Sequence, residues 1–454
     1  MDGVRFSIIR SKQTTQSDHQ PSIHKQITHV RINARHEQPK DYGLAQKMSQ
    51  AKDKRLKRVW QSAISVLLVL GIISACQGEE IYSLPERDPI PKVNPSPTVP
   101  TATASPTPVP TATATPFPIV PIRSTSMPLY DFAEGVNPLT GLAVDDPSIL
   151  ERRPVMVKVS NWPRDGRPHA GLSAADIVFE YFIGYQMNRF MAIYYGQDSA
   201  NIGPVRSGQL VDAKLVRLYQ GLLAYGNADP AVDKVIVNVL GERVLAFGFI
   251  PCPAMCGETT HSATGVFANS AEITKYAIET GINNDKPDLR GMYFQNDLDN
   301  WDDLGNELSF MYADFSVIQW RYNGDVGKYE LWQDFETEDD RIILAPMVDR
   351  DTDQPLSFSN ILILFATYTQ FSPSLNDIDL FVGERPQSAI LFRDGKLIYG
   401  SWQAPYQDYP LIFNTQDGDL LPLKPGNTWV VIAGNHTLTE RISSGEWDFS
   451  FELP

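Results

Sequence analysis

The chain has 454 residues, which is enough for two or three domains, and 34 of them are proline. Its formal net charge of −15 is unevenly distributed, because residues 1–75 carry 13 Lys/Arg and only 5 Asp/Glu. From residue 76 onward, 26 basic and 49 acidic residues give a net charge of −23, which repels phosphate backbones and argues against nucleic acid as a partner.

Residues 1–47 are polar, basic and without a regular apolar pattern. They separate the start of the chain from a segment of secretory type that begins at Met48. We therefore expect that translation starts at Met48, or that residues 1–47 are disordered. If residues 1–47 are translated, the apolar run that follows is expected to act as an internal anchor.

Residues 48–76 have the parts of a bacterial lipoprotein signal peptide. A stretch with five Lys/Arg precedes an almost wholly apolar run of eleven residues, Ala63–Ile73, and Ser74-Ala75-Cys76 follows. The run is shorter than the roughly 20 apolar residues of a membrane-spanning helix. The end looks like a lipobox, so we expect a lipid on Cys76 to anchor the exported chain to the outer face of the bacterial cell membrane. The alternative is a plain membrane anchor with an incidental cysteine.

Residues 77–134 form a Pro/Thr-rich linker, in which residues 85–128 alone hold thirteen prolines and eight threonines. This composition has no apolar period and cannot bury a core, so we expect a disordered, extended stalk. Such a stalk holds the folded part away from the membrane, where cell-wall material and other envelope proteins are candidate partners.

Residues 135–290 are predicted to form a layered α/β domain. Apolar segments predict strands at Arg153–Ser160, Ile177–Ile183 and Arg189–Tyr195. A first helix would carry Val211, Leu215, Leu218 and Leu222 on one face and stop at Gly226. A second would run from Asp229 to Gly241 with Val232, Val235, Ile236 and Val239 inward, and a third from Asn269 to Gly281.

Residues 310–454 are predicted to form a β-rich domain, so the fold class is mixed α+β. Strands are expected at Asn360–Tyr368, Thr428–Ala433 and Trp447–Leu453. The dipeptide Asp394-Gly395 lies between two apolar segments, which predicts a hairpin with a type I′ turn.

Several motifs in this part of the chain resemble the YerB-like lipoprotein family of bacteria. They are NPLTGL (137–142), RPV (153–155), GLSAADIVFE (171–180), RF (189–190), GPVRS (203–207) and LKPGNTW (423–429). The resemblance covers about residues 135–435 and implies a lipoprotein with two domains. It supplies no established activity and no cofactor.

The motif GPVRS precedes the first predicted helix and suggests a binding site for an anion. Ser207 would cap the helix, and Arg206 would lie beside its positive end. Arg206 would then either pair with Glu180 or Asp176 or meet a carboxylate or phosphate ligand. We group Arg206, Ser207, Glu180, Arg189 and His261 as candidate ligand-binding residues.

Two other readings remain open. Ser207, His261 and Asp176 could form a nucleophilic triad of an envelope hydrolase or transferase, although no nucleophile-elbow sequence surrounds Ser207. The chain could also be a structural interaction module.

Cys252 and Cys256 are expected to form a disulfide in an exported protein, with metal binding together with His261, or free thiols, as alternatives. No metal is expected at Asp349-Arg350-Asp351, because the calcium-loop spacing lacks its glycine and its final glutamate. That segment is expected to be a solvated acidic turn. The sequence thus favours a ligand-binding or envelope-assembly lipoprotein over an enzyme.

Overall fold

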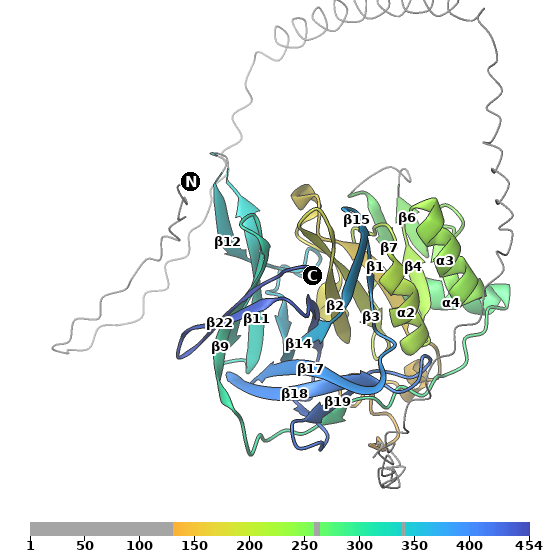
Figure 1. Ribbon diagram of the computed structural model, residues 1–454. Helices are drawn as coiled ribbons and strands as arrows, with labels where there is room; N and C mark the ends of the chain where they lie inside the picture. Colours follow the sequence, from red (N-terminus) through yellow and green to blue (C-terminus); the bar gives the residue numbers. More distant parts are fainter. Residues whose placement is uncertain (1–129, 258–263, 338, 340) are drawn as a thin grey trace, which may run out of the picture. The chain divides into compact units, whose positions relative to one another are not determined.

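The computed structural model describes residues 130–454, apart from residues 258–263, 338 and 340 (Figure 1). The predictions for residues 1–47, for the signal peptide with Cys76, and for the linker up to residue 129 therefore lie outside the described residues. The same is true of His261.

One large mixed sheet organises the described part of the chain. Its strands follow in the order β5, β4, β1, β3, β2, β21, β14, β17, β18 and β19. Their bounds are Val244–Ala246, Leu222–Tyr225, Val155–Ser160, Met187–Tyr194, Ile177–Gly184, Thr428–Gly434, Asn360–Ala366, Gly383–Arg393, Lys396–Ala404 and Ile412–Thr415. Strands β1, β4 and β5 are parallel, as the helices that connect β3 to β4 and β4 to β5 allow.

The sheet takes strands from both predicted domains. Strand β2 pairs in parallel with β21, so that Ile177 lies opposite Thr428 and Glu180 lies opposite Val431. The mixed fold class is therefore confirmed in a coarse form, as a strand-rich chain with a large mixed sheet. The pairing of β2 with β21 places strands of both predicted domains in one sheet, so residues 135–290 do not form a separate layered α/β sheet.

A second group of strands packs beside the first sheet. It runs β12, β11, β10, β9, β23 and β22, with β13 also paired to β11. The long strand β9 joins the two groups, because its first residues pair with β18. The bounds are Ile342–Pro346, Lys328–Glu336, Ser316–Asn323, Asp303–Ala313, Gly445–Ser450, Leu438–Ser443 and, for β13, Ser357–Phe358. Short pairs complete the strands: β15 Tyr368–Ser372 with β16 Leu375–Ile378, β8 Tyr293–Phe294 with β20 Pro422–Leu423, and β6 Met255–Gly257 with β7 Val266–Ala268.

Aromatic side chains fill the space between the two groups of strands. Trp429 of β21 is fully buried and meets Phe190 of β3 with ring centroids 4.9 Å apart. It also meets Trp320 of β10 at 6.1 Å and Phe358 of β13 at 5.0 Å. Because large aromatic side chains bury the most apolar area, this cluster ties the two predicted domains into one core.

Three α-helices, α2 (Leu210–Leu218), α3 (Pro230–Leu240) and α4 (Ser270–Thr280), gather beside β1 and β4 (Figure 1). The caps expected at Asp229 and Asn269 are confirmed, since Asp229 accepts from the Ala231 N–H and Asn269 accepts from the Glu272 N–H. No helix in the described residues is long and apolar enough to cross a membrane.

Two details of the predicted helices are wrong. Leu222 begins strand β4 and does not extend α2, because Gln220 turns the chain at φ 51° and a side chain on Gly221 would lie 2.7 Å from Met156. Val235 and Val239 are 40% and 42% exposed, because α3 buries only the row formed by Val232, Ile236 and Leu240.

The hairpin predicted at Asp394-Gly395 is confirmed. Asp394 and Gly395 have φ values of 53° and 70°, as a type I′ turn requires, and Arg393 pairs with Lys396. A Cβ on Gly395 would also lie 2.9 Å from Asn306 and Tyr322, so both the backbone and the packing favour glycine here.

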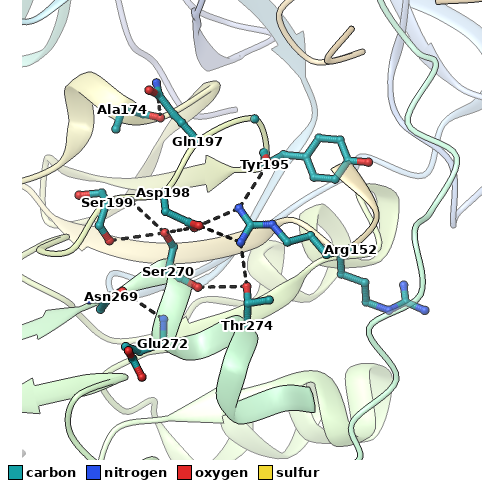
Figure 2. Close-up of polar contacts among 12 residues, drawn as sticks. Arg152, Ala174, Tyr195, Gln197, Asp198, Ser199, Asn269, Ser270, Glu272 and Thr274 are labelled. Atoms are coloured by element: carbon teal, nitrogen blue, oxygen red, sulfur yellow. Dashed lines mark hydrogen bonds and ion pairs between the residues drawn. The ribbon is translucent and has the colours of Figure 1, made fainter. Parts of the chain in front are cut away.

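A buried arginine holds the start of α4 against the sheet (Figure 2). Arg152 donates from both terminal nitrogens to Asp198 at 3.0 Å, and further to Thr274 and to the Tyr195 carbonyl. Ser270 donates to the same carboxylate at 2.6 Å. The charge of Arg152 is thus balanced by Asp198, and most of its N–H donors have an acceptor.

Candidate functional site

The loop before α2 lies at the carboxyl ends of two neighbouring parallel strands, β1 and β4. Arg206 donates its backbone N–H to the Lys158 carbonyl of β1 at 2.9 Å, and its own carbonyl accepts from Gly226, just after β4, at 2.9 Å. Gly208 donates to the Asn227 carbonyl at 2.7 Å. Ligands of α/β sheets commonly bind at the carboxyl ends of such strands, so this loop is held at a suitable place.

Two arginines meet at this loop. Arg189 lies on β3 opposite Ser160 and donates Nη1 to the Ser207 carbonyl at 3.0 Å. The side chain of Arg206 makes no hydrogen bond within the described part of the chain, and the Nε of each arginine is buried without an acceptor there. Neither arginine has an ion pair with any described residue, in contrast to Arg152.

Burial raises the free energy of the charged forms of Arg189 and Arg206. It lowers the pKa of Arg206 below its ordinary value. Burial, and then the neighbouring charge of Arg206, lower the pKa of Arg189 to about 10. A charged group that is desolvated and lacks a counter-ion is a candidate for ligand binding, because a bound anion would offset both costs.

A buried ionic cluster lies next to the arginine pair. Lys158 of β1 lies 3.1 Å from the Asp212 carboxylate of α2, and the Tyr181 hydroxyl hydrogen-bonds to both. All three side chains are fully buried. Burial, opposed by Asp212 and assisted by Arg189, lowers the pKa of Lys158 to about 8.

We did not predict this cluster, although the sequence carries a signal for it. Lys158 is the one charged residue of a strand that is otherwise apolar or small, and Asp212 sits among apolar residues of α2. A lone charge in a buried element usually has a buried partner.

Glu180 lies away from the arginines. It is adjacent to Tyr181 on β2, and successive residues of a strand point to opposite faces. Its carboxylate accepts from Asn188 Nδ2 at 2.5 Å and from Trp429 Nε1 at 2.7 Å, between the two groups of strands. Burial raises the pKa of Glu180 to about 7.

Asp176 is also engaged elsewhere. It lies at the amino end of β2 and accepts from Asn137 at 2.9 Å and from the N–H groups of Tyr195 and Gly196. The expected alternative of an ion pair between Arg206 and Glu180 or Asp176 is therefore wrong.

Ser207 does not cap α2. Gln209 is the N-cap, with a reciprocal capping box to Asp212, and the Ser207 hydroxyl donates to Asn227 Oδ1 at 2.7 Å. Since Asp176 lies at the opposite end of the parallel strands, the triad of Ser207 with Asp176 is not assembled. Strand β3 returns the chain to the amino end of β2, where Tyr195 and Gly196 donate to Asp176, and the segment that follows then carries Ser207 to the carboxyl end of β1.

The structure joins Cys252 and Cys256 through a disulfide, with Cα atoms 4.8 Å apart. Within residues 130–454, leaving out the gaps, no group of three His, Cys, Asp or Glu side chains is placed to hold a metal ion. Asp349 differs from the expected solvated turn, because it is buried and accepts from the N–H groups of Gly171 and Ser173.

Comparison with known proteins places the chain in a family. Residues 139–279 match "Protein of unknown function (DUF3048) N-terminal domain", and residues 308–430 match its C-terminal counterpart. The chain belongs to this two-domain family, and neither domain description assigns an activity.

Two similar proteins make the resemblance more specific. A curated relative from Bacillus subtilis (strain 168), "Putative lipoprotein YerB", is 28% identical over 311 residues, which are 68% of this chain and 89% of the relative. The solved "Crystal structure of YerB protein from Bacillus subtilis" has a TM-score of 0.53 at 25% identity, and covers 65% of this chain and 96% of that chain. The resemblance drawn from the sequence motifs is confirmed.

Proposed function

We propose that this chain is an exported lipoprotein, anchored through Cys76 to the outer face of the bacterial cell membrane, that binds an anionic ligand at Arg189 and Arg206. The name of the B. subtilis relative and the signal-like residues 48–76 support the anchor. The observation that carries the ligand site is the pair of partly buried guanidinium groups without a counter-ion.

The proposal includes the expected organisation of the chain. Residues 77–134 act as a disordered stalk that carries the α/β residues 135–290 and the β-rich residues 310–454, which share one mixed sheet. The stalk gives the arginine pair access to cell-wall material or to other envelope proteins beyond the membrane surface. No cofactor is needed for such a binding protein.

The lipid anchor is tested by Cys76→Ser. The wild-type chain is expected in the membrane fraction of cells, with a mass gain on the peptide that begins at Cys76. The variant should lose the mass gain and leave the membrane fraction after a high-salt wash, because the thioether cannot form. An unchanged membrane fraction for the variant would contradict lipid anchoring and favour a membrane-spanning anchor.

The ligand site is tested by thermal unfolding of the full-length protein in detergent. The additives are inorganic phosphate, acetate and acidic cell-wall sugars. A ligand at a hundred times its dissociation constant should stabilise the protein by about 2.7 kcal/mol, which is readily measured. Arg206→Gln should abolish this stabilisation.

Arg321→Gln is the matched control, because it removes the same charge from β10, where Arg321 stacks on Trp332. It should leave the stabilisation unchanged. Equal loss in both variants, or no stabilisation by any additive, would rule out the arginine pair as a ligand site for these anions.

A further inference from the structure

The charges around the arginine pair do not cancel. Lys158, Arg189 and Arg206 contribute three positive charges, and Asp212 is the acidic group whose charge acts on Lys158 and Arg189. The pKa of Tyr181 is raised well above its ordinary value, so its hydroxyl stays neutral. The Lys158–Asp212 pair balances itself, which leaves the two guanidinium charges unmatched.

The hydrogen-bond donors of the two arginines are also mostly unused. Arg189 uses one donor on the Ser207 carbonyl, and Arg206 uses none from its guanidinium on the described residues. Each guanidinium has five N–H donors in a fork that matches two oxygens of a carboxylate or phosphate. One carboxylate satisfies one fork and one charge, and would leave the second arginine desolvated and unmatched.

From this charge and donor count we infer that the group bound here is dianionic and tetrahedral, of the phosphate monoester class. This inference rests on the proposed function and specifies its ligand. A phosphate monoester offers three acceptor oxygens and a charge of about −1.5 to −2 near neutral pH, so it can meet both forks and both charges. A phosphate diester or a carboxylate has a single charge and matches one arginine only.

The protein side of the site keeps its charge between pH 5 and pH 7. The pKa of Arg189 is about 10 and that of Lys158 is about 8, so both remain protonated in this range. The second proton of a phosphate monoester leaves at pH about 6, which raises the dianion fraction about tenfold from pH 5 to pH 7. Affinity for a monoester should rise by a similar factor, whereas affinity for sulfate, a dianion throughout, should stay constant.

The test is calorimetric titration of the full-length protein in detergent with glycerol phosphate, sulfate, dimethyl phosphate and acetate at pH 5 and pH 7. We expect glycerol phosphate at pH 7 to bind at least tenfold more tightly than acetate or dimethyl phosphate. Arg206→Lys keeps the charge and loses the fork, so it should weaken glycerol phosphate binding while Arg321→Lys does not. Phosphatidic acid dispersed in the same detergent, added as competitor, tells a lipid headgroup from a soluble monoester.

The outcomes distinguish the dianionic ligand from the anion site itself. Acetate binding as tightly as glycerol phosphate, with both lost in Arg206→Gln, would overturn the dianion inference and leave the anion site standing. No binding of any of the four anions, together with an inert Arg206→Gln, would overturn both.

Discussion

Replacing Lys158 with methionine is expected to lower the free energy of unfolding by about 3 to 5 kcal/mol, because it leaves the Asp212 carboxylate buried without its counter-ion. Both side chains are fully buried, so water cannot compensate for the loss. Methionine has nearly the volume of lysine, and the expected effect is therefore electrostatic. Urea unfolding of the full-length protein in detergent, followed by tryptophan fluorescence, measures it.

A second ion pair on the same helix provides the control. Lys214 pairs with Asp377 at 2.8 Å, but these side chains are 20% and 30% exposed, so Lys214→Met should cost no more than about 1 kcal/mol. In a double-mutant cycle, Asp212→Leu combined with Lys158→Met should destabilise by much less than the sum of the single changes. Additive effects would mean that the two side chains are not coupled.

The elements that could be predicted from the sequence are those with local signals. The turn at Asp394-Gly395 needs two residues with positive φ, and the helix caps at Asp229 and Asn269 need a side-chain acceptor, so each is determined by its immediate neighbours. Strand β4 is not predicted because its first residue, Leu222, continues the helical spacing of Val211, Leu215 and Leu218, and Gly221 is the one boundary signal before it.

The pairing of β2 with β21 has no local signal at all. Ile177 and Thr428 lie opposite each other although about 250 residues separate them, and they are held together by long-range contacts, namely the ladder between β2 and β21 and the packing of Trp429 on Phe190. The same limit applies to the candidate site. Arg189 and Arg206 both lie at the loop before α2, whereas Glu180 lies away from them, because the face on which a strand residue lies depends on which side the helices cover.

Replacing Glu180 with glutamine is expected to change how stability depends on pH. The Glu180→Gln variant should become progressively more stable relative to wild type as the pH rises from about 4.5 to 7. Burial raises the pKa of Glu180 from 4.5 to about 7, so in this range the folded wild type holds a proton that the unfolded chain has released. Wild-type stability therefore falls with rising pH, by about 3 kcal/mol in total, and is constant above pH 7. Glutamine has no such proton.

Only the difference in unfolding free energy between wild type and Glu180→Gln isolates the contribution of Glu180. Burial raises the pKa of Asp176 to about 6, which also lowers stability with rising pH, whereas burial lowers the pKa of His169 to about 3, which acts in the opposite direction up to pH about 6.5. Both groups are present in wild type and variant, so their contributions cancel when the two unfolding free energies are subtracted.

The difference in unfolding free energy between Glu180→Gln and wild type at pH 4.5 reports on the hydrogen bonds of this side chain. The two carboxylate oxygens accept from Asn188 and from Trp429, whereas glutamine offers one oxygen and one NH₂ group, so one donor must face another donor. The variant should therefore start less stable than wild type, by about 1 to 3 kcal/mol, and recover as the pH rises. Asp176→Asn is the matched control, and its difference should level off about one pH unit lower. If the difference in unfolding free energy between Glu180→Gln and wild type is flat from pH 5 to pH 7, the prediction is wrong. Glu180 is then ionised throughout this range, and a charged carboxylate is buried between the two groups of strands.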